Sequence, residues 1–305
     1  MDAATVRPAH QVAENALARL GADRARFSLP PGVPRQDIPA AALRGLAELA
    51  LAAGTVLRFP VTGPDAARTA QDLMDFAWHE LRDGELLHQV QRDTPAATRP
   101  VEVYSHFAAA GYRHAGLDDL AAHLHGLRAA HVTELPPHRR LAVLAATRRL
   151  GLPDPPDAAE LTRRTWLGGT PEPWMLDRAH AHALARTVLH LTDWAAHPHA
   201  LPPDLAAYTD RWLPVWTETY AGTHSWDLVC ELLAAGASLP RPSLPPTLWA
   251  RLAEAQHPDG TLLTGPPPHD NGDPPADHHP TVVAVVAGTL TVLRALDTVT
   301  DGTPP

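Results

Sequence analysis

Proline-rich breaks divide this chain into a series of segments that each carry a helical pattern. The three clearest breaks lie at residues 30–34, 153–156 and 240–246. Proline cannot continue a helix but fits its first turn, so each break indicates the end of one helix and the start of another. No run of alternating β-branched residues predicts a strand. The sequence therefore predicts an all-α protein.

The predicted helices number about a dozen and are joined mostly by short loops. They lie near residues 4–20, 39–53, 65–91, 100–112, 117–130, 137–150, 157–165, 172–196, 203–221, 225–238, 245–256 and 280–297. Such a series predicts a single helical domain over residues 1–305, either an (α/α) toroid or another closed array of helical hairpins. An open solenoid is the alternative, but no clear internal repeat supports it.

One loop is unusually long for a compact helical domain. Residues 265–277 are rich in proline, glycine and aspartate, a composition that cannot pack into a core. Long loops inside compact domains are usually functional or disordered. Because this loop leads directly into His278 and His279, we expect it to cover an active site.

Composition excludes several classes of chemistry and partner. Lysine is absent, which excludes a Schiff-base or phosphate-loop lysine. Cys230 is the only cysteine, so neither an intrachain disulfide nor a multi-cysteine zinc site can form. The net charge of −9 argues against nucleic acid and anionic membrane as partners. The most apolar stretch, residues 282–293, is too short to span a bilayer, and no signal-peptide pattern opens the chain, so we expect a cytoplasmic protein.

The predicted helix 172–196 carries a polar stripe. His182, Arg186, His190 and Asp193 recur at helical spacing and fall on one face, opposite an apolar stripe. The ordinary alternative is an amphipathic helix whose polar face lies in solvent. The neighbouring Thr187, Thr192 and Trp194 make this face unlike a solvated one, which favours a polar cavity.

A second polar group lies at residues 224–231. Asp227 and Glu231 are one helical turn apart, with Trp226 beside them. Ser225 can cap this helix, and Asp227 would then interact with the helix dipole in the first turn. Glu231 lies too deep for that role. A buried carboxylate needs a partner, and we expect Arg186 to supply it.

The third group is His278 and His279, directly before Pro280. Pro280 fits the first helical position, which places His279 near the N-cap. The positive end of the helix dipole would lower the pKa of His279 and favour the neutral imidazole that a general base requires. The alternative is a histidine exposed in a loop.

Metal binding is a separate hypothesis, because the chain has 19 histidines. The His-X-His pairs diverge on a helix, and no His-Glu-X-X-His motif is present, so we expect no metal and no cofactor. A site built from His190, Asp193, Asp227 and His279 stays open. In the N-terminal half, residues such as Tyr104 and His106 are interpreted mainly as packing or surface, with the far wall of a cavity as the alternative.

The three groups resemble the motifs of an all-helical family of unknown function that is common in actinomycete-type, GC-rich genomes. The match covers about residues 165–290 and agrees in order and spacing. The matching positions are Thr187, Val188, Leu191, Thr192 and Asp193; Asp227, Leu228, Glu231 and Leu232; Gln256, Asp259 and Gly260; and His279, Thr281 and Val282. Arg186 stands where the family has histidine and His278 where it has tyrosine. A mechanism that needs the family's first histidine is therefore in doubt here.

This family looks like the (α/α) toroids of peptide-tailoring enzymes, and more distantly like the zinc-independent class V type lanthipeptide cyclases. The resemblance implies a natural-product enzyme that adds a thiol to a dehydroamino acid and forms a thioether ring. We expect His279 as base, Arg186 as enolate stabiliser and His278 as acid, with Asp193 or Asp227 orienting a histidine. The expected substrate-binding residues are His182, His190, Trp194, Trp226 and Glu231.

Two other functions are alternatives. One is a metal-dependent oxidase or hydrolase that uses the His/Asp set named above. The other is a non-catalytic helical module that binds a leader peptide or a partner enzyme. In each case the expected ligand is a peptide or a small natural product.

Overall fold

The computed structural model describes residues 3–30, 38–155, 158–265 and 278–300, and its regular elements within these ranges are helical. The predicted all-α class is confirmed. Of the predicted active-site loop, residues 266–277 lie outside the described residues.

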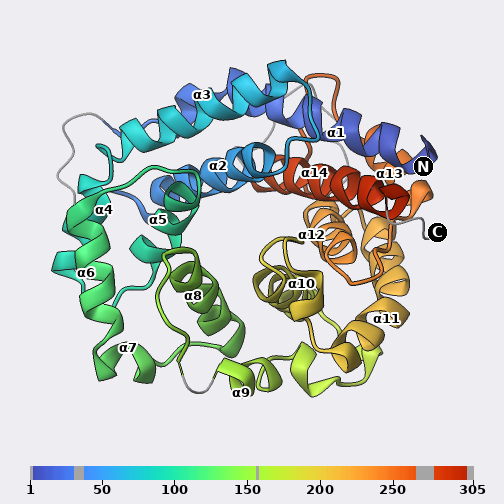
Figure 1. The fold of residues 1–305 in the computed structure, drawn as a ribbon. Coiled ribbons are helices and arrows are strands. Elements are labelled where there is room, and N and C mark those ends of the chain that lie inside the picture. The colour runs from blue at the N-terminus through green and yellow to red at the C-terminus, as the bar shows by residue number, and fades with distance from the viewer. Residues whose placement is uncertain (1–2, 31–37, 156–157, 266–277, 301–305) are drawn as a thin grey trace.

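Six helices form an inner ring (Figure 1). They are α2 (Ala40–Arg58), α5 (Arg99–Ala109), α8 (Pro137–Arg149), α10 (Arg178–Leu191), α12 (Trp226–Ala237) and α14 (His279–Thr300). Each contacts the next in this order, and α14 contacts α2, so the contacts form a closed cycle. The arrangement is compatible with the toroid that the sequence predicts.

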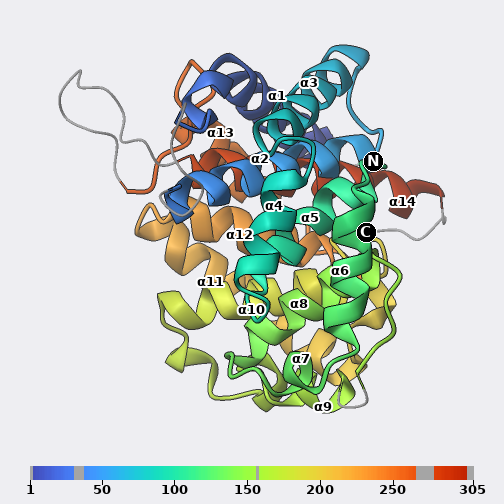
Figure 2. The same ribbon diagram turned by 90° about the vertical axis from the view of Figure 1, so that its left-hand side faces the viewer.

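The remaining helices lie outside the inner ring. They are α1 (Ala3–Ala22), α3 (Pro64–Glu80), α4 (Glu85–Asp93), α6 (Ala115–His125), α7 (Arg128–Val132), α9 (Ala158–Arg163), α11 (Pro203–Gly222) and α13 (Pro246–Ala255). The side view shows α4 and α6 covering α5 and α8 (Figure 2). The largest apolar core lies between the two layers, where α1 packs on α14 and α2 on α3.

Proline marks the start of several helices, as the sequence predicts. Pro64, Pro137, Pro203 and Pro246 each occupy the first residue of a helix, where a missing N–H costs no hydrogen bond.

Three predicted helices differ from the structure. The segment 65–91 is two helices, because residues 82–84 all adopt positive φ. A Cβ on Gly84 would lie 2.7 Å from the ring of Trp78, so only glycine fits there. The segment 117–130 is divided into α6 and α7. The segment 172–196 is helical as α10 only from Arg178 to Leu191.

By length and composition, two inner helices are long and apolar enough to cross a membrane, so the expectation that the longest apolar stretch is too short is wrong. They are Ala40–Arg58 and His279–Thr298. In the second helix, 72% of the apolar 18-residue stretch is buried inside the fold, as expected for a core helix. This signal is weak evidence for a membrane protein.

The contact between α1 and α14 depends on Gly288. A Cβ at this position would lie 2.5 Å from the carbonyl oxygen of Ala9 and 2.7 Å from the Cβ of Ala13. We expect Gly288→Ala to lower the free energy of unfolding by about 1–3 kcal/mol, because overpacked helices must move apart. Urea denaturation measures the loss. Gly222→Ala is the control, since its Cβ would meet no atom within 4 Å; equal stability of both variants would contradict the prediction.

Candidate functional site

Polar side chains from all six inner helices surround one chamber at the N-terminal ends of these helices. We call it the N-terminal chamber; its volume is about 800 Å³. Its charged lining residues are Arg44 and Glu48 of α2, Arg99 and Glu102 of α5, Arg139 of α8, Arg186 of α10, and Asp227 and Glu231 of α12, together with the histidines His106, His182, His190, His278 and His279. The three stretches that the sequence singles out therefore meet one another.

Glu231 lies at the centre of the polar contacts in this chamber. Its side chain is 4% exposed. One carboxylate oxygen lies 2.9 Å from Nδ1 of His182. The other accepts a hydrogen bond from Arg186 at 3.3 Å and lies 3.2 Å from Nε2 of His279. Burial raises the pKa of Glu231, but its bonds to His182 and His279 and the charge of Arg186 outweigh burial and lower it. The predicted Arg186–Glu231 pair is confirmed.

His279 lies between two carboxylates. Its Nε2 faces Glu231, and its Nδ1 lies 3.2 Å from Oε1 of Glu48. Burial alone would lower the pKa of His279, but the carboxylates of Glu231 and Glu48 beside its two ring nitrogens raise it to about 10. The predicted lowering of the pKa of His279 is therefore wrong: two carboxylates outweigh the helix dipole and favour the protonated imidazole.

The raised pKa of His279 predicts a pH dependence of stability. The folded-state pKa of about 10 exceeds the ordinary value of 6.5, so protonation favours the folded state. This contribution is complete below about pH 6.5 and is lost as the pH rises through 10. Urea denaturation between pH 6 and 10 should show wild type losing on the order of a few kcal/mol relative to His279→Gln. Parallel pH profiles of the two proteins would contradict the assignment.

Asp227 is buried beside His182. Its Oδ2 lies 2.5 Å from Arg178 and 3.7 Å from Nε2 of His182. Its Oδ1 is buried without a hydrogen-bond partner among the described residues. Ser225 is the N-cap residue of α12 and Asp227 lies in its first turn, as predicted, but the Ser225 side chain forms no capping hydrogen bond. Asp227 pairs with Arg178.

Of two further predicted site residues, His278 lies in the chamber and Trp226 does not. His278 lines the chamber and its ring centroid lies 4.4 Å from that of Phe27. Trp226 is buried in the large apolar core, edge-on to His224, and is not among the described residues that line the chamber. Its burial supports a packing role.

Asp193 lies outside the N-terminal chamber. Helix α10 ends at Leu191, and Asp193 follows in a left-handed turn. The predicted continuous stripe is therefore broken after His190. A metal set that joins Asp193 to Asp227 and His279 does not assemble, because Asp193 lies among the C-terminal ends of α2 and α8.

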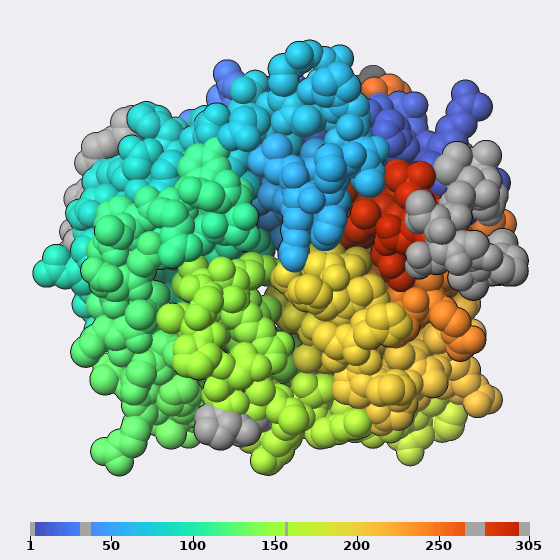
Figure 3. All heavy atoms as spheres, in the orientation of Figure 1, coloured from blue at the N-terminus to red at the C-terminus, as the bar shows by residue number. Residues whose placement is uncertain are grey.

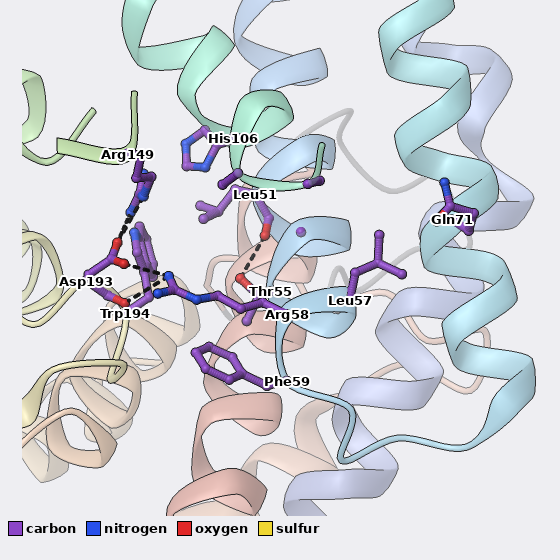
Figure 4. Close-up of a pocket in the computed structure, with 13 residues that line it drawn as sticks. Leu51, Thr55, Leu57, Arg58, Phe59, Gln71, His106, Arg149, Asp193 and Trp194 are labelled. Carbon is purple, nitrogen blue, oxygen red and sulfur yellow. Dashed lines mark hydrogen bonds and ion pairs between the residues drawn. The ribbon is translucent and has the colours of Figure 1, made fainter. Parts of the chain in front are cut away.

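A second chamber opens at those C-terminal ends. We call it the C-terminal chamber; its volume is about 640 Å³, and its lining includes Arg58, Arg149 and Asp193. Figure 3 shows this face of the ring, where the light-blue end of α2, the green end of α8 and the yellow segment after α10 surround a central hollow. In Figure 4, Arg58 and Arg149 both point toward Asp193.

Three residues line both chambers and mark the place where they meet: Leu51, His106 and Trp194. His190 lies beside them, with its ring edge-on to Trp194. Burial, followed by the charge of Arg149, lowers the pKa values of His106 and His190 to about 3. Both imidazoles are therefore neutral at physiological pH.

Sequence reasoning missed most of the wall that comes from the N-terminal half. Glu48, Glu102 and Arg139 line the N-terminal chamber, and Glu102 accepts a hydrogen bond from Arg139 at 2.7 Å. Each stands on a helix that bears other charged residues, so no local signal marks it. His106 was anticipated only as part of a possible far wall.

A separate cluster on the outer layer contains Glu85, His88 and His114, whose ligand atoms lie within 4.8 Å of one another. Nδ1 of His114 accepts the backbone N–H of Leu117 at 3.0 Å. The proton of a neutral His114 ring therefore sits on Nε2, the nitrogen that faces Glu85. This geometry opposes metal binding through Nε2, and we assign the cluster no ion.

Comparison with known proteins places the chain in a family. A family model described as a domain of unknown function, DUF6895, matches residues 13–289. No curated protein matches the chain, and no solved structure does. The expected resemblance to a helical family of unknown function is thus confirmed, over more of the chain than residues 165–290.

Proposed function

This chain belongs to the DUF6895 family, and we propose that it is an enzyme that performs acid–base chemistry in the N-terminal chamber. One observation carries the proposal: the buried Glu231 carboxylate holds two imidazoles, His182 and His279, in a cavity large enough for a substrate. Groups with strongly shifted pKa values in a polar cavity are typical of active sites. Structural ion-pair networks shift pKa values too, so the test must measure turnover.

The contacts suggest a division of roles. Glu231 accepts from Nδ1 of His182, which leaves Nε2 of His182 to take a proton from the substrate. The protonated His279 is the acid. Both of its ring nitrogens face carboxylates, so its contact with Glu48 must open before Nδ1 can give a proton to the substrate. Arg186 donates a single hydrogen bond to Glu231 and is 40% exposed, so its remaining N–H groups can stabilise negative charge on a substrate oxygen. The role of base therefore passes from His279 to His182.

The most specific form of the proposal is thioether formation in a natural-product peptide, in the cytoplasm. His182 takes the proton of a cysteine thiol, and the sulfur forms a bond to the β-carbon of a dehydroamino acid. The carbon–carbon double bond becomes an enolate, which Arg186 stabilises, and His279 delivers a proton to the α-carbon. The product is an isomer of the substrate, so no oxidant or cofactor is needed.

A synthetic peptide that contains cysteine and dehydroalanine tests this form. In D₂O the product should gain one carbon-bound deuterium and lose its alkylatable thiol, as mass spectrometry measures. His182→Gln should lower the rate at least roughly 10²-fold. His123→Gln, an exposed histidine on α6, is the matched control and should react like wild type.

A second experiment tests the broader proposal that the protein is an enzyme, because the true substrate can differ from the synthetic peptide. Cell extract is incubated with wild type or His182→Gln, and untargeted mass spectrometry records which species each consumes. Species consumed by wild type alone would support an enzyme even if the synthetic peptide does not react. If wild type consumes nothing, or if both proteins consume the same species at equal rates, the proposal is wrong and a binding module becomes the better account.

A further inference from the structure

We propose that the C-terminal chamber is an anion-binding site, in which Arg58 and Arg149 hold a carboxylate or phosphate group. The site is separate from the chemistry proposed for the N-terminal chamber and does not depend on it. The juxtaposition that carries the proposal is two guanidinium groups sharing one carboxylate at the wall of a cavity of about 640 Å³.

The charges in this chamber do not balance. Arg149 binds Oδ1 of Asp193 through two nitrogens, at 2.7 and 2.9 Å. Arg58 lies 2.7 Å from Oδ2 of the same carboxylate and also donates to the Asp193 backbone oxygen at 3.3 Å. Among the described residues that line the chamber, Asp193 is the only acidic one. One positive charge is therefore left without a countercharge in the wall.

The excess charge is partly shielded from water. The side chain of Arg149 is 10% exposed and that of Arg58 is 38% exposed. Burial, opposed by Asp193, lowers the pKa of Arg149. The nearest imidazole in the lining, His106, is held neutral by burial and by the charge of Arg149. A buried arginine that shares its carboxylate partner with a second arginine is stabilised by an added anion.

An unsatisfied donor points to a ligand at the same place. Nε1 of Trp194 is buried and has no hydrogen-bond partner among the described residues. Figure 4 shows Trp194 beside the ion pair of Arg149 and Asp193. An indole N–H can only donate, so an oxygen of a bound anion would satisfy it. Guanidinium groups bind carboxylate and phosphate oxygens in pairs, which defines the class of ligand.

The backbone holds this wall in a strained conformation. Asp193, Trp194 and Ala195 have φ values of 45°, 56° and 66°, three successive non-glycine residues in the left-handed region. Such residues persist only where the surrounding structure fixes them, and they concentrate at functional sites. Here two ion pairs fix Asp193, and the N–H of Trp194 donates to the Leu189 carbonyl at 2.9 Å. The turn presents the carboxylate and the indole in a preformed arrangement.

The test is an NMR titration of the ¹⁵N-labelled full chain with sodium phosphate, and separately with sodium acetate, at constant ionic strength. The indole N–H signal of Trp194 is assigned from its loss in Trp194→Phe. We expect this signal to shift saturably with at least one anion, and the tighter anion identifies whether phosphate or carboxylate is preferred.

Arg58→Gln should weaken the anion at least tenfold, since it removes the more accessible guanidinium. Arg148→Gln is the matched control, because Arg148 neighbours Arg149 but pairs with Asp154 at the surface; it should bind like wild type. Circular dichroism establishes that both variants are folded. Absence of a saturable shift with either anion, or equal affinity of the two variants, would overturn the proposal.

Discussion

Replacing Glu231 by glutamine is expected to lower the free energy of unfolding by about 3–5 kcal/mol and to abolish detectable turnover. Glutamine keeps the size of the side chain but removes the charge that holds three groups. Among the described residues, His279 would keep Glu48 as a countercharge, and Arg186 would lose the carboxylate that it contacts in the chamber. His182 would lose the acceptor that orients its ring. Structure and chemistry therefore fail together.

Urea denaturation at pH 7 measures the stability part of this expectation. Glu218→Gln is the matched control, because Glu218 pairs with Arg251 on the surface, where such pairs contribute about 0–1 kcal/mol. Suppose that the Glu231→Gln protein is as stable as the control. The desolvation cost of the buried carboxylate would then equal the stabilisation that its three contacts supply. Such a result would leave Glu231 without the central role assigned to it.

Asp193→Asn is the second substitution with a large expected effect, a loss of about 3 kcal/mol or more. Asparagine tolerates the left-handed conformation better than most residues, so the turn itself is little affected. The loss comes from Arg149, which stays buried without its countercharge, and from Arg58. The substitution therefore separates the ion-pair contribution from the backbone strain.

Asp154→Asn is the comparison for this variant, because it breaks the exposed pair with Arg148 near the same end of α8. Urea denaturation should show little change for Asp154→Asn and a large one for Asp193→Asn. Phosphate should restore part of the stability of the Asp193 variant if the C-terminal chamber binds anions. Equal losses in the two variants would show that the ion pairs on Asp193 are worth no more than surface pairs.

The fold is largely predictable from the sequence because its signals are local. Proline at the first helical residue and the 3.6-residue apolar pattern act within one or two turns, as at Pro137 and Pro203. The helix boundaries that the sequence does not predict depend on contacts with distant residues. Gly84, for example, can be recognised as obligatory only once Trp78 and His114 are seen packed against it.

The site is predictable only in part, for the same reason. The residues of α10, α12 and α14 were found because polar groups within apolar helices are unusual. The protonation state of His279 was missed because it depends on Glu48, which lies on a distant part of the chain. The location of Asp193 was missed because the left-handed turn after Leu191 leaves no pattern in the helical spacing. The local sequence pattern identifies many residues of the site, whereas contacts between distant residues determine their protonation and position.

The protonation state of the two histidines on Glu231 is the most direct test of the account. The measurement is a pH titration of the ring ¹⁵N shifts of His182 and His279, assigned with His182→Gln and His279→Gln. The account predicts that both nitrogens of His279 stay protonated through neutral pH and titrate only near pH 10. It also predicts that Glu231→Gln lowers this midpoint. A His279 that titrates near 6.5, unaffected by Glu231→Gln, would contradict the assignment of His279 as the acid.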